Sequence, residues 1–261
     1  MESKVKKILN IKSLYKYYES GTSSNKVKAI NRVSMEIESG EFVGIMGASG
    51  SGKTTLLNII ATIDEASEGV VNFNGIDITK LSDEQLSKLR NEKIGLIFQD
   101  YNLLDTLTLY ENILLAVVNL DVNDNDIRKK IIEIAEELGI REVLNHYPYE
   151  VSGGQRQRCA CARAIIKKPE IILADEPTGA LDTNSSHALL GTLETLNKKY
   201  NSTILMVTHD PVAASYCSRI LVLNDGKICA EILRGEKSKK QLFNDILKMN
   251  ITFSGGLDEI L

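Results

Sequence analysis

Long apolar runs are missing from this sequence of 261 residues. The longest, Ile113–Val118, falls far short of the roughly 20 residues that cross a bilayer, and Asn119 and Asp121 end it. The N-terminal segment Met-Glu-Ser-Lys-Val-Lys-Lys lacks the apolar centre of a signal peptide. We therefore expect a cytoplasmic protein, whose work at a membrane would depend on a partner chain.

An excess of positive charge is also missing. The chain has 31 lysine and arginine residues against 35 aspartate and glutamate residues, a net charge of −4. Proteins that bind nucleic acid neutralise its phosphates with basic side chains. We therefore expect no nucleic-acid partner.

Cysteine is scarce and lacks the spacing of a zinc site. The four residues, Cys159, Cys161, Cys217 and Cys229, form no Cys-x-x-Cys pair, and a reducing compartment disfavours disulfides. Cys159 and Cys161 fall in a helical run among alanines, where small buried side chains are a simpler explanation than thiol chemistry.

What the sequence does contain is the composition of a globular domain, with 43% hydrophobic and 25% charged residues. Strand-like segments occur at residues 8–18, 32–37, 41–46, 70–73, 94–98, 171–174, 203–207 and 219–223. The early ones are joined by short turns, as in an antiparallel sheet. The later ones alternate with helical segments, as in a parallel, doubly wound sheet.

Helical patterns fill the space between residues 110 and 166. Helices are predicted over residues 111–119, 124–138 and 154–166, and Ser82–Gln85 has the form of a capping box that opens another helix before Ile94. A last helix, over residues 239–249, is expected to dock on the chain's own domain. One face of that helix carries Leu242, Phe243, Ile246 and Leu247.

The most informative segment is Gly47-Ala-Ser-Gly-Ser-Gly-Lys-Thr54, which fits the pattern Gly-x-x-x-x-Gly-Lys-Ser/Thr. It lies between a predicted buried strand and a predicted helix that begins at Lys53. Glycines let backbone N–H groups turn inward, and a helix N-terminus attracts anions. Lys53 would reach the outer phosphates and Thr54 would offer its hydroxyl to Mg²⁺. The segment predicts that the protein binds a nucleoside triphosphate.

Two carboxylates, Asp175 and Glu176, end the apolar strand Ile171–Ala174. Adjacent acids repel each other and are costly to desolvate, so a purely structural role does not explain them. We expect Asp175 to hold Mg²⁺ and Glu176 to act as general base for the attacking water. His209 follows the next strand. Alone it would more often cap or pack, but beside these motifs we favour a contact with the γ-phosphate.

A second anion site is predicted at Ser152, Gly153, Gly154 and Gln155, which open a helix in the inserted block. One chain does not need two phosphate-binding segments so far apart in sequence. A homodimer does, if this segment closes over the nucleotide held by the other subunit.

These motifs together resemble those of the ATP-binding subunits of ABC transporters, over nearly the whole chain. The resemblance implies an α/β P-loop NTPase (ABC ATPase) fold with an antiparallel β subdomain and an inserted α-helical subdomain. The resemblance implies that residues 1–261 form one nucleotide-binding domain. The core with its β subdomain would cover about 1–99 and 167–235, the helical subdomain about 100–166, and a C-terminal helical tail 236–261.

The resemblance also implies ATP and Mg²⁺ as ligands, and a role for each site residue. Tyr18 would stack on adenine, with Tyr15 and Tyr17 as rival candidates. Glu176, His209 and Gln99 would form the catalytic group, and Asp182 would lie in the loop that joins the two sites of the dimer. The metal ligands would be Thr54, Gln99 and Asp175, and the phosphate loop would consist of Gly47, Ala48, Ser49, Gly50, Ser51, Gly52, Lys53, Thr54 and Thr55.

The chain departs from the family pattern at two positions. Val151 stands where the family usually has leucine, and Thr54 stands where serine is commoner. Both changes keep the chemistry.

Residues 98–109, 174–182 and 208–217 resemble the bacitracin- and lantibiotic-resistance branch, which is related to macrolide-exporter and lipoprotein-release ATPases. The resemblance implies a separate membrane permease, peripheral attachment at the inner face of the membrane, and possible association with a two-component sensor kinase. Residues 100–111 would dock a permease helix through Tyr101, Leu103 and Leu104, although these three could equally pack inside the domain.

Three alternatives stay open. Within the family, the chain could serve lipoprotein release or macrolide export. A soluble ABC ATPase acting on ribosomes or DNA usually has two cassettes or long basic or coiled-coil insertions, which this chain lacks. A monomeric P-loop kinase would leave residues 152–155 without a role.

Overall fold

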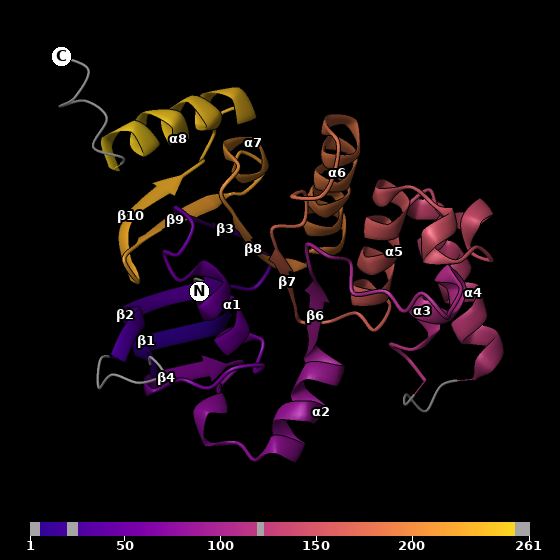
Figure 1. Cartoon of the computed structure of the whole chain (residues 1–261), viewed down its shortest axis with the longest axis horizontal. Helices are drawn as coiled ribbons and strands as arrows, with labels where there is room; N and C mark the ends of the chain where they lie inside the picture. Colours follow the sequence, from indigo (N-terminus) through magenta and orange to yellow (C-terminus); the bar gives the residue numbers. More distant parts are fainter. Residues whose placement is uncertain (1–5, 20–25, 119–122, 254–261) are drawn as a thin grey trace, which may run out of the picture.

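Two β-sheets organise the fold in the computed structural model, which describes residues 6–19, 26–118 and 123–253 (Figure 1). The smaller sheet is antiparallel, in the order β2-β1-β4-β5. Its strands are β1 (Lys7–Glu19), β2 (Lys26–Glu38), β4 (Glu68–Phe73) and β5 (Ile76–Asp77). One face of β1 buries Leu9, Ile11 and Leu14, so this sheet has one apolar face and one exposed face.

The larger sheet has the order β10-β9-β3-β8-β7-β6, and only β10 runs antiparallel to its neighbour. Its strands are β3 (Phe42–Met46), β6 (Ile94–Ile97), β7 (Ile171–Asp175), β8 (Thr203–Thr208), β9 (Arg219–Asn224) and β10 (Lys227–Leu233). Strands β3 and β8 are buried along their whole length, which is typical of parallel sheets covered on both faces.

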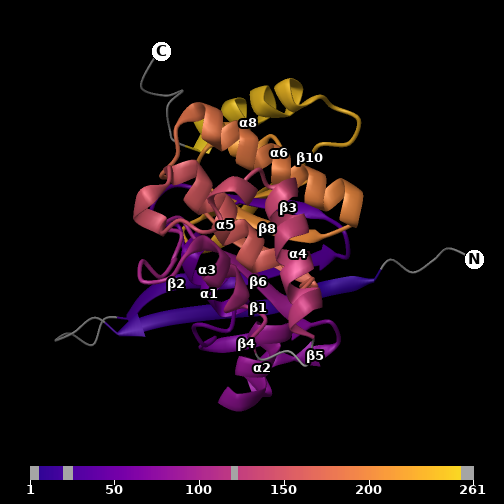
Figure 2. The ribbon, with the colours of Figure 1, turned by 90° about the vertical axis from the view of Figure 1, so that its right-hand side faces the viewer.

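Helices cover the larger sheet, and three of them gather at one end of the molecule (Figures 1 and 2). These three are α3 (Leu109–Leu114), α4 (Asp124–Glu137) and α5 (Gly153–Ile165), all between β6 and β7 in the sequence. The others are α1 (Lys53–Ile60), α2 (Asp83–Lys93), α6 (Thr183–Tyr200), α7 (Pro211–Ala214) and α8 (Lys239–Phe253). Within the described ranges, no helix combines the length and apolarity needed to cross a membrane.

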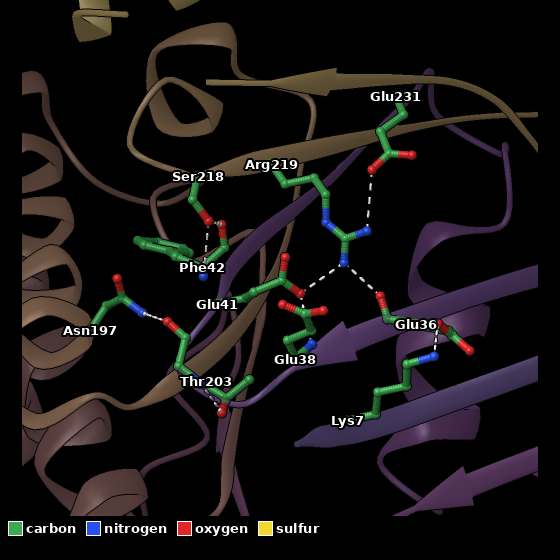
Figure 3. Close-up of polar contacts among 11 residues, drawn as sticks. Lys7, Glu36, Glu38, Glu41, Phe42, Asn197, Thr203, Ser218, Arg219 and Glu231 are labelled. Atoms are coloured by element: carbon green, nitrogen blue, oxygen red, sulfur yellow. Dashed lines mark hydrogen bonds and ion pairs between the residues drawn. The ribbon is translucent and has the colours of Figure 1, made fainter. Parts of the chain in front are cut away.

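Arg219, the first residue of β9, joins the two sheets (Figure 3). Its guanidinium donates to the Glu36 carbonyl of β2 at 2.5 Å, to Glu41 at 2.8 Å and to Glu231 of β10 at 3.2 Å. Glu41 in turn accepts from the Glu38 backbone N–H at 2.7 Å. The planar guanidinium can make these bonds together. The two sheets are therefore fixed to each other near the N-terminal end of β3, opposite its C-terminal end.

Most predicted elements are present with small shifts of their ends, and the predicted α/β fold is confirmed. The capping box at Ser82 and Gln85 is formed. The predicted helix over residues 111–119 is wrong at its end: α3 stops at Leu114 and turns follow to residue 118, whereas Asn119 lies outside the described residues. Strands β5 and β10 and helices α6 and α7 were not among the predicted elements.

The last helix docks on the domain, but one residue of its predicted apolar face does not. Leu242 and Ile246 are fully buried, one turn apart, whereas Leu247 is 38% exposed. A residue one position further along a helix lies about 100° around the axis. The buried stripe of α8 is therefore narrower than predicted.

Burial of three cysteines supports their packing role. Cys159, Cys161 and Cys217 are inaccessible to solvent, and burial raises the pKa of the Cys159 and Cys161 thiols to about 12. Thiolates are the reactive form, so these residues are inert at neutral pH.

Candidate nucleotide-binding site

The segment after β3 forms a tight loop that only glycine can build at two positions. A Cβ atom at Gly47 would lie 2.1 Å from the Leu223 carbonyl oxygen. Gly52 has a φ of 101° and a Cβ there would lie 2.3 Å from the Ala29 carbonyl oxygen. Both glycines are therefore required by close approach of the backbone, and the second also by a left-handed conformation.

Helix α1 begins directly after this loop and leaves its N-terminus open. Gly52 is the N-cap, and no side chain caps the first turn. Its unpaired N–H groups and its dipole both favour an anion.

Lys53 points into the loop, where its ammonium donates to the carbonyls of Gly47 at 2.9 Å and Ala48 at 2.8 Å. Burial lowers the pKa of Lys53, while the nearby carboxylates of Glu176 and Asp175 act in the opposite direction. The loop thus holds one desolvated cation where phosphates would lie.

Asp175 faces this loop from the end of β7. The Thr54 hydroxyl donates to its Oδ1 at 3.3 Å. Burial raises the pKa of Asp175, an effect that the bond from Thr54 opposes. Strands β3, β7 and β8 run parallel, so their carboxyl ends open at one edge of the sheet and bring these residues together.

Glu176 and His209 lie side by side at the same edge. Nδ1 of His209 is 3.0 Å from Oε1 of Glu176. Glu176 has a positive φ of 43°, and its backbone N–H donates to the Val207 carbonyl at 2.9 Å. This left-handed conformation is uncommon for a residue with a side chain and is often found at functional sites. A cavity of about 350 Å³, lined by both side chains and by His187, adjoins the pair.

Of the three candidate tyrosines, Tyr18 is the one whose contacts connect it to α1, the helix that follows the phosphate loop. Its hydroxyl donates to Asp64 at 2.5 Å, and it is close enough to Thr55 for a hydrogen bond. Burial and the bond to Asp64 raise the pKa of Tyr18. Tyr15 and Tyr17 instead stack on each other with ring centroids 6.0 Å apart. Tyr18 remains 41% exposed, so its ring can still receive a partner.

Gln99 follows β6 and packs on the loop after Glu176. A Cβ atom at Gly179 would lie 3.0 Å from the amide carbon of Gln99. The Gly179 N–H closes a turn onto the Glu176 carbonyl at 2.9 Å. Gln99 therefore lies against the turn that Glu176 begins, and its catalytic role stays a prediction.

Residues 152–155 form the first turn of α5, where Gly153 lies against Tyr101 and Ala180. Ser152 caps the helix: its hydroxyl accepts from the Gln155 N–H at 3.2 Å, and its own N–H donates to the Gln155 side chain at 2.9 Å. The expectation of freely exposed donors is thus too simple, because capping uses two of them. Gly153 and Gly154 carry the others.

Asp182 caps α6 beside that turn. It accepts from the Ser185 N–H at 2.9 Å and from the Ser185 hydroxyl at 2.6 Å, and these bonds lower its pKa. A Cβ atom at Gly154 would lie 2.8 Å from the Ser185 hydroxyl. The starts of α5 and α6 therefore form one second cluster.

The two clusters do not form a single site in one chain. In Figure 1, α1 and α5 lie apart, with β7 and β6 between them in the view. Of the predicted residues, Tyr18, the phosphate loop, Gln99, Asp175, Glu176 and His209 come together. Ser152–Gln155 and Asp182 form the separate cluster.

Sequence reasoning missed residues that hold the site in place. Lys16 pairs with Asp64 at 2.5 Å and lies 4.8 Å from the centroid of the Tyr18 ring. Gln157, in α5, is fully buried. Its amide among the buried alanines and cysteines of that helix was the available signal.

A phosphate loop after β3, with acids at the end of β7 and one parallel strand, β8, between them, defines a P-loop nucleoside triphosphatase. Residues 30–179 match the family model described as ABC transporter. The bacitracin export ATP-binding protein BceA of Halalkalibacterium halodurans is 48% identical, over 95% of this chain and 97% of that protein. YvcR of Bacillus subtilis, an uncharacterized ABC transporter ATP-binding protein, is 46% identical over 95% of each chain.

The dimeric structure of the ATP-binding cassette MJ0796 with ADP and Pi, a post-hydrolysis state, superposes with a TM-score of 0.80. It is 38% identical and covers 86% of this chain and 98% of its own. The chain therefore belongs to the ABC transporter family. It is an ATP-binding, ATP-hydrolysing subunit.

Proposed function

We propose that this subunit powers a separate membrane permease that removes or exports peptide antibiotics of the bacitracin or lantibiotic type. The assignment to this branch is supported by the 48% identity to a bacitracin export ATPase over almost the full length of both chains. The observation that supports hydrolysis is the arrangement of Lys53, Thr54, Asp175, Glu176 and His209 at one sheet edge.

In this proposal Glu176 is the general base. It accepts a proton from the water whose oxygen attacks the γ-phosphorus. As that bond forms, the bond from the γ-phosphorus to the bridging oxygen breaks and ADP departs as the leaving group. His209, 3.0 Å from Glu176, orients that carboxylate and contacts the γ-phosphate. Lys53 turns from the loop carbonyls to the phosphates, and the open N-terminus of α1 binds the phosphate oxygens. Tyr18 stacks on adenine.

Mg²⁺ fits the residues beside the loop. Thr54, Asp175 and Gln99 supply a hydroxyl, a carboxylate and an amide oxygen, which are the hard oxygen ligands that Mg²⁺ prefers. The 3.3 Å contact between Thr54 and Asp175 already brings two of these donors together. Bound there, the ion would neutralise phosphate charge.

The second cluster, Ser152–Gln155 with Asp182, serves the other subunit in this proposal. Two chains close face to face, so that each phosphate loop receives the α5 N-terminus of its partner. The separation of α1 and α5 within one chain supports this. The helical block, residues 100–166, then acts as the subdomain that delivers the second cluster.

The permease contact is proposed at the edge of the larger sheet. Edge strand β6 lines a groove of about 770 Å³ together with α2 and α5, including Arg90, Leu96 and Arg163. Of the three predicted contact residues, none of which lines this groove, Leu104 is 50% exposed. Tyr101 and Leu103 are instead partly buried within the domain. Attachment there would hold the protein at the cytoplasmic face of the membrane, where a sensor kinase can join the complex.

The test uses the bacterium that carries the gene. Deletion should sensitise it to bacitracin or lantibiotics and leave macrolide sensitivity and lipoprotein sorting unchanged. The unaltered gene should restore resistance, whereas the Glu176→Gln gene should not. A change only in lipoprotein sorting or macrolide tolerance would keep the motor and refute the branch.

A further inference from the structure

We propose that Gln157 is a positioning residue that fastens helix α5 to both loops of the hydrolytic group. Its side chain is fully buried. The amide Nε2 donates to the Phe98 carbonyl at 3.2 Å and to the Pro177 carbonyl at 2.9 Å. Phe98 directly precedes Gln99, and Pro177 directly follows Glu176. One buried amide therefore connects two predicted catalytic residues to the helix that begins at Ser152.

The orientation of this amide is fixed by its partners. Both acceptors are carbonyl oxygens, so only the NH₂ end of Gln157 can face them. Oε1 finds no hydrogen-bond donor in the described part of the chain. Burying such an oxygen costs stability that an apolar side chain of similar size would not. Packing alone thus does not explain the residue, whereas a link between the two loops does.

Two arginines of the same helix strengthen the attachment to the Gln99 loop. Arg163 donates to the Tyr101 carbonyl at 2.8 Å and also to the Asn102 carbonyl. The Arg156 guanidinium lies 5.1 Å from the centroid of the Tyr101 ring. Helix α5 therefore holds residues 98–102 at several points, while Gln157 alone among these three also reaches the Glu176 loop.

The Glu176 loop is held from its other side by the sheet. The Glu176 N–H donates to the Val207 carbonyl of β8 at 2.9 Å. Gln157 and Val207 thus hold the two sides of this short turn. A displacement of α5 would act on the Gln99 and Glu176 loops together. This inference rests on the proposed hydrolytic role of Glu176 and adds a connection from the α5 N-terminus to it.

The experiment compares ATP hydrolysis by two folded variants. Gln157→Met keeps the side-chain volume and loses both N–H donors of the amide. Gln157→Asn keeps an amide, but its side chain is too short for that amide to reach both carbonyls. Each should lower kcat roughly 10- to 100-fold, the effect of a small misplacement of reacting groups. The KM for ATP should stay within about twofold, because Gln157 touches neither the phosphate loop nor Tyr18.

Cys161→Ala is the matched control, since Cys161 lies one turn further along α5 and is equally buried. It should lower the melting temperature without changing kcat. The second measurement combines Gln157→Met with Gln99→Ala. If Gln157 acts by holding the Gln99 loop, the two losses should be less than multiplicative.

An unchanged kcat in either folded Gln157 variant, or fully multiplicative losses, would overturn the inference. The proposed function is judged separately, by whether the unaltered protein hydrolyses ATP and Glu176→Gln does not.

Discussion

At the scale of single residues, the sequence predicted which residues carry the chemistry better than it predicted the contacts between them. Gly47, Gly52 and Lys53 could be predicted because close backbone approach and phosphate charge leave few alternatives. The adjacent acids Asp175 and Glu176 were predictable because their repulsion and desolvation make a purely structural role improbable. The two bonds of Gln157 were not, because its partners are backbone carbonyls whose positions depend on the tertiary fold.

Glu176→Gln should separate binding from hydrolysis. Glutamine keeps the size of the side chain but cannot accept the proton, so kcat should fall about 10²- to 10⁴-fold or more while ATP affinity is retained. Lys53→Ala should instead weaken ATP binding roughly 10- to 100-fold, because a charged phosphate partner is lost. Titration with a fluorescent ATP analogue and a phosphate-release assay measure the two effects. Near-normal turnover by Glu176→Gln would rule out its role as base.

Asp175→Asn should stabilise the nucleotide-free protein while impairing hydrolysis. Burial raises the pKa of Asp175, so the ionised carboxylate destabilises the folded protein at pH values above that pKa. This destabilisation disappears at low pH, where Asp175 is protonated in both the folded and the unfolded protein. The variant should therefore gain at most about 1 kcal/mol at pH 7–8, because solvent screens this partly exposed carboxylate, and almost nothing below about pH 3. Chemical denaturation at several pH values measures this. A gain that does not depend on pH would contradict the assigned cause.

At the scale of elements, apolar patterns in the sequence identified the buried strands but not β10, the more exposed strand at one edge of the larger sheet. Strand β10 is exposed or partly buried at every residue except Ile232, and it lacks the continuous apolar run that marked β7 and β8. The turn before it was a usable signal, because Asp225 and Gly226 both have positive φ, as Asp-Gly hairpin turns require. Sheet order was not predictable, since β3 inserts between β8 and β9.

Helix α8 is held on α6 by a shared carboxylate. Glu194 of α6 accepts from Lys239 of α8 at 2.6 Å and from Lys198 at 2.8 Å, and Arg234 lies 3.8 Å away. Burial alone would raise the pKa of Glu194, but these bonds outweigh it and hold the pKa below its usual range. The network should therefore contribute stability at neutral pH that is lost as Glu194 protonates.

Glu194→Gln should destabilise the protein by about 1–2 kcal/mol at pH 7, since it breaks this partly buried network. The difference from the unaltered protein should shrink below about pH 4. Glu92→Gln is the control, because its exposed pair with Lys88 spans 3.9 Å and should be worth under about 0.5 kcal/mol. Equal effects of the two substitutions would show that α8 does not depend on the shared carboxylate.

At the scale of the whole molecule, the fold separates the residues proposed to contact the nucleotide into two clusters. The residues proposed to bind phosphate and Mg²⁺ and to accept the proton lie at the carboxyl edge of β3, β7 and β8. The turn proposed as a second anion site, at the start of α5, belongs to the other cluster. The sequence predicted this division, because two phosphate-binding motifs in one chain are best explained by a second copy. The path that joins the clusters, through Gln157, became visible only in the structure.

The central claim is that ATP closes two copies of this chain into a dimer with shared sites. Size-exclusion chromatography of the Glu176→Gln protein tests it most directly, because that variant should bind ATP without consuming it. We expect a dimer with ATP and Mg²⁺, a monomer with ADP, and loss of the dimer when Ser152→Arg, which places bulk and charge at the α5 N-terminus, is added. A monomer with both nucleotides would contradict the claim.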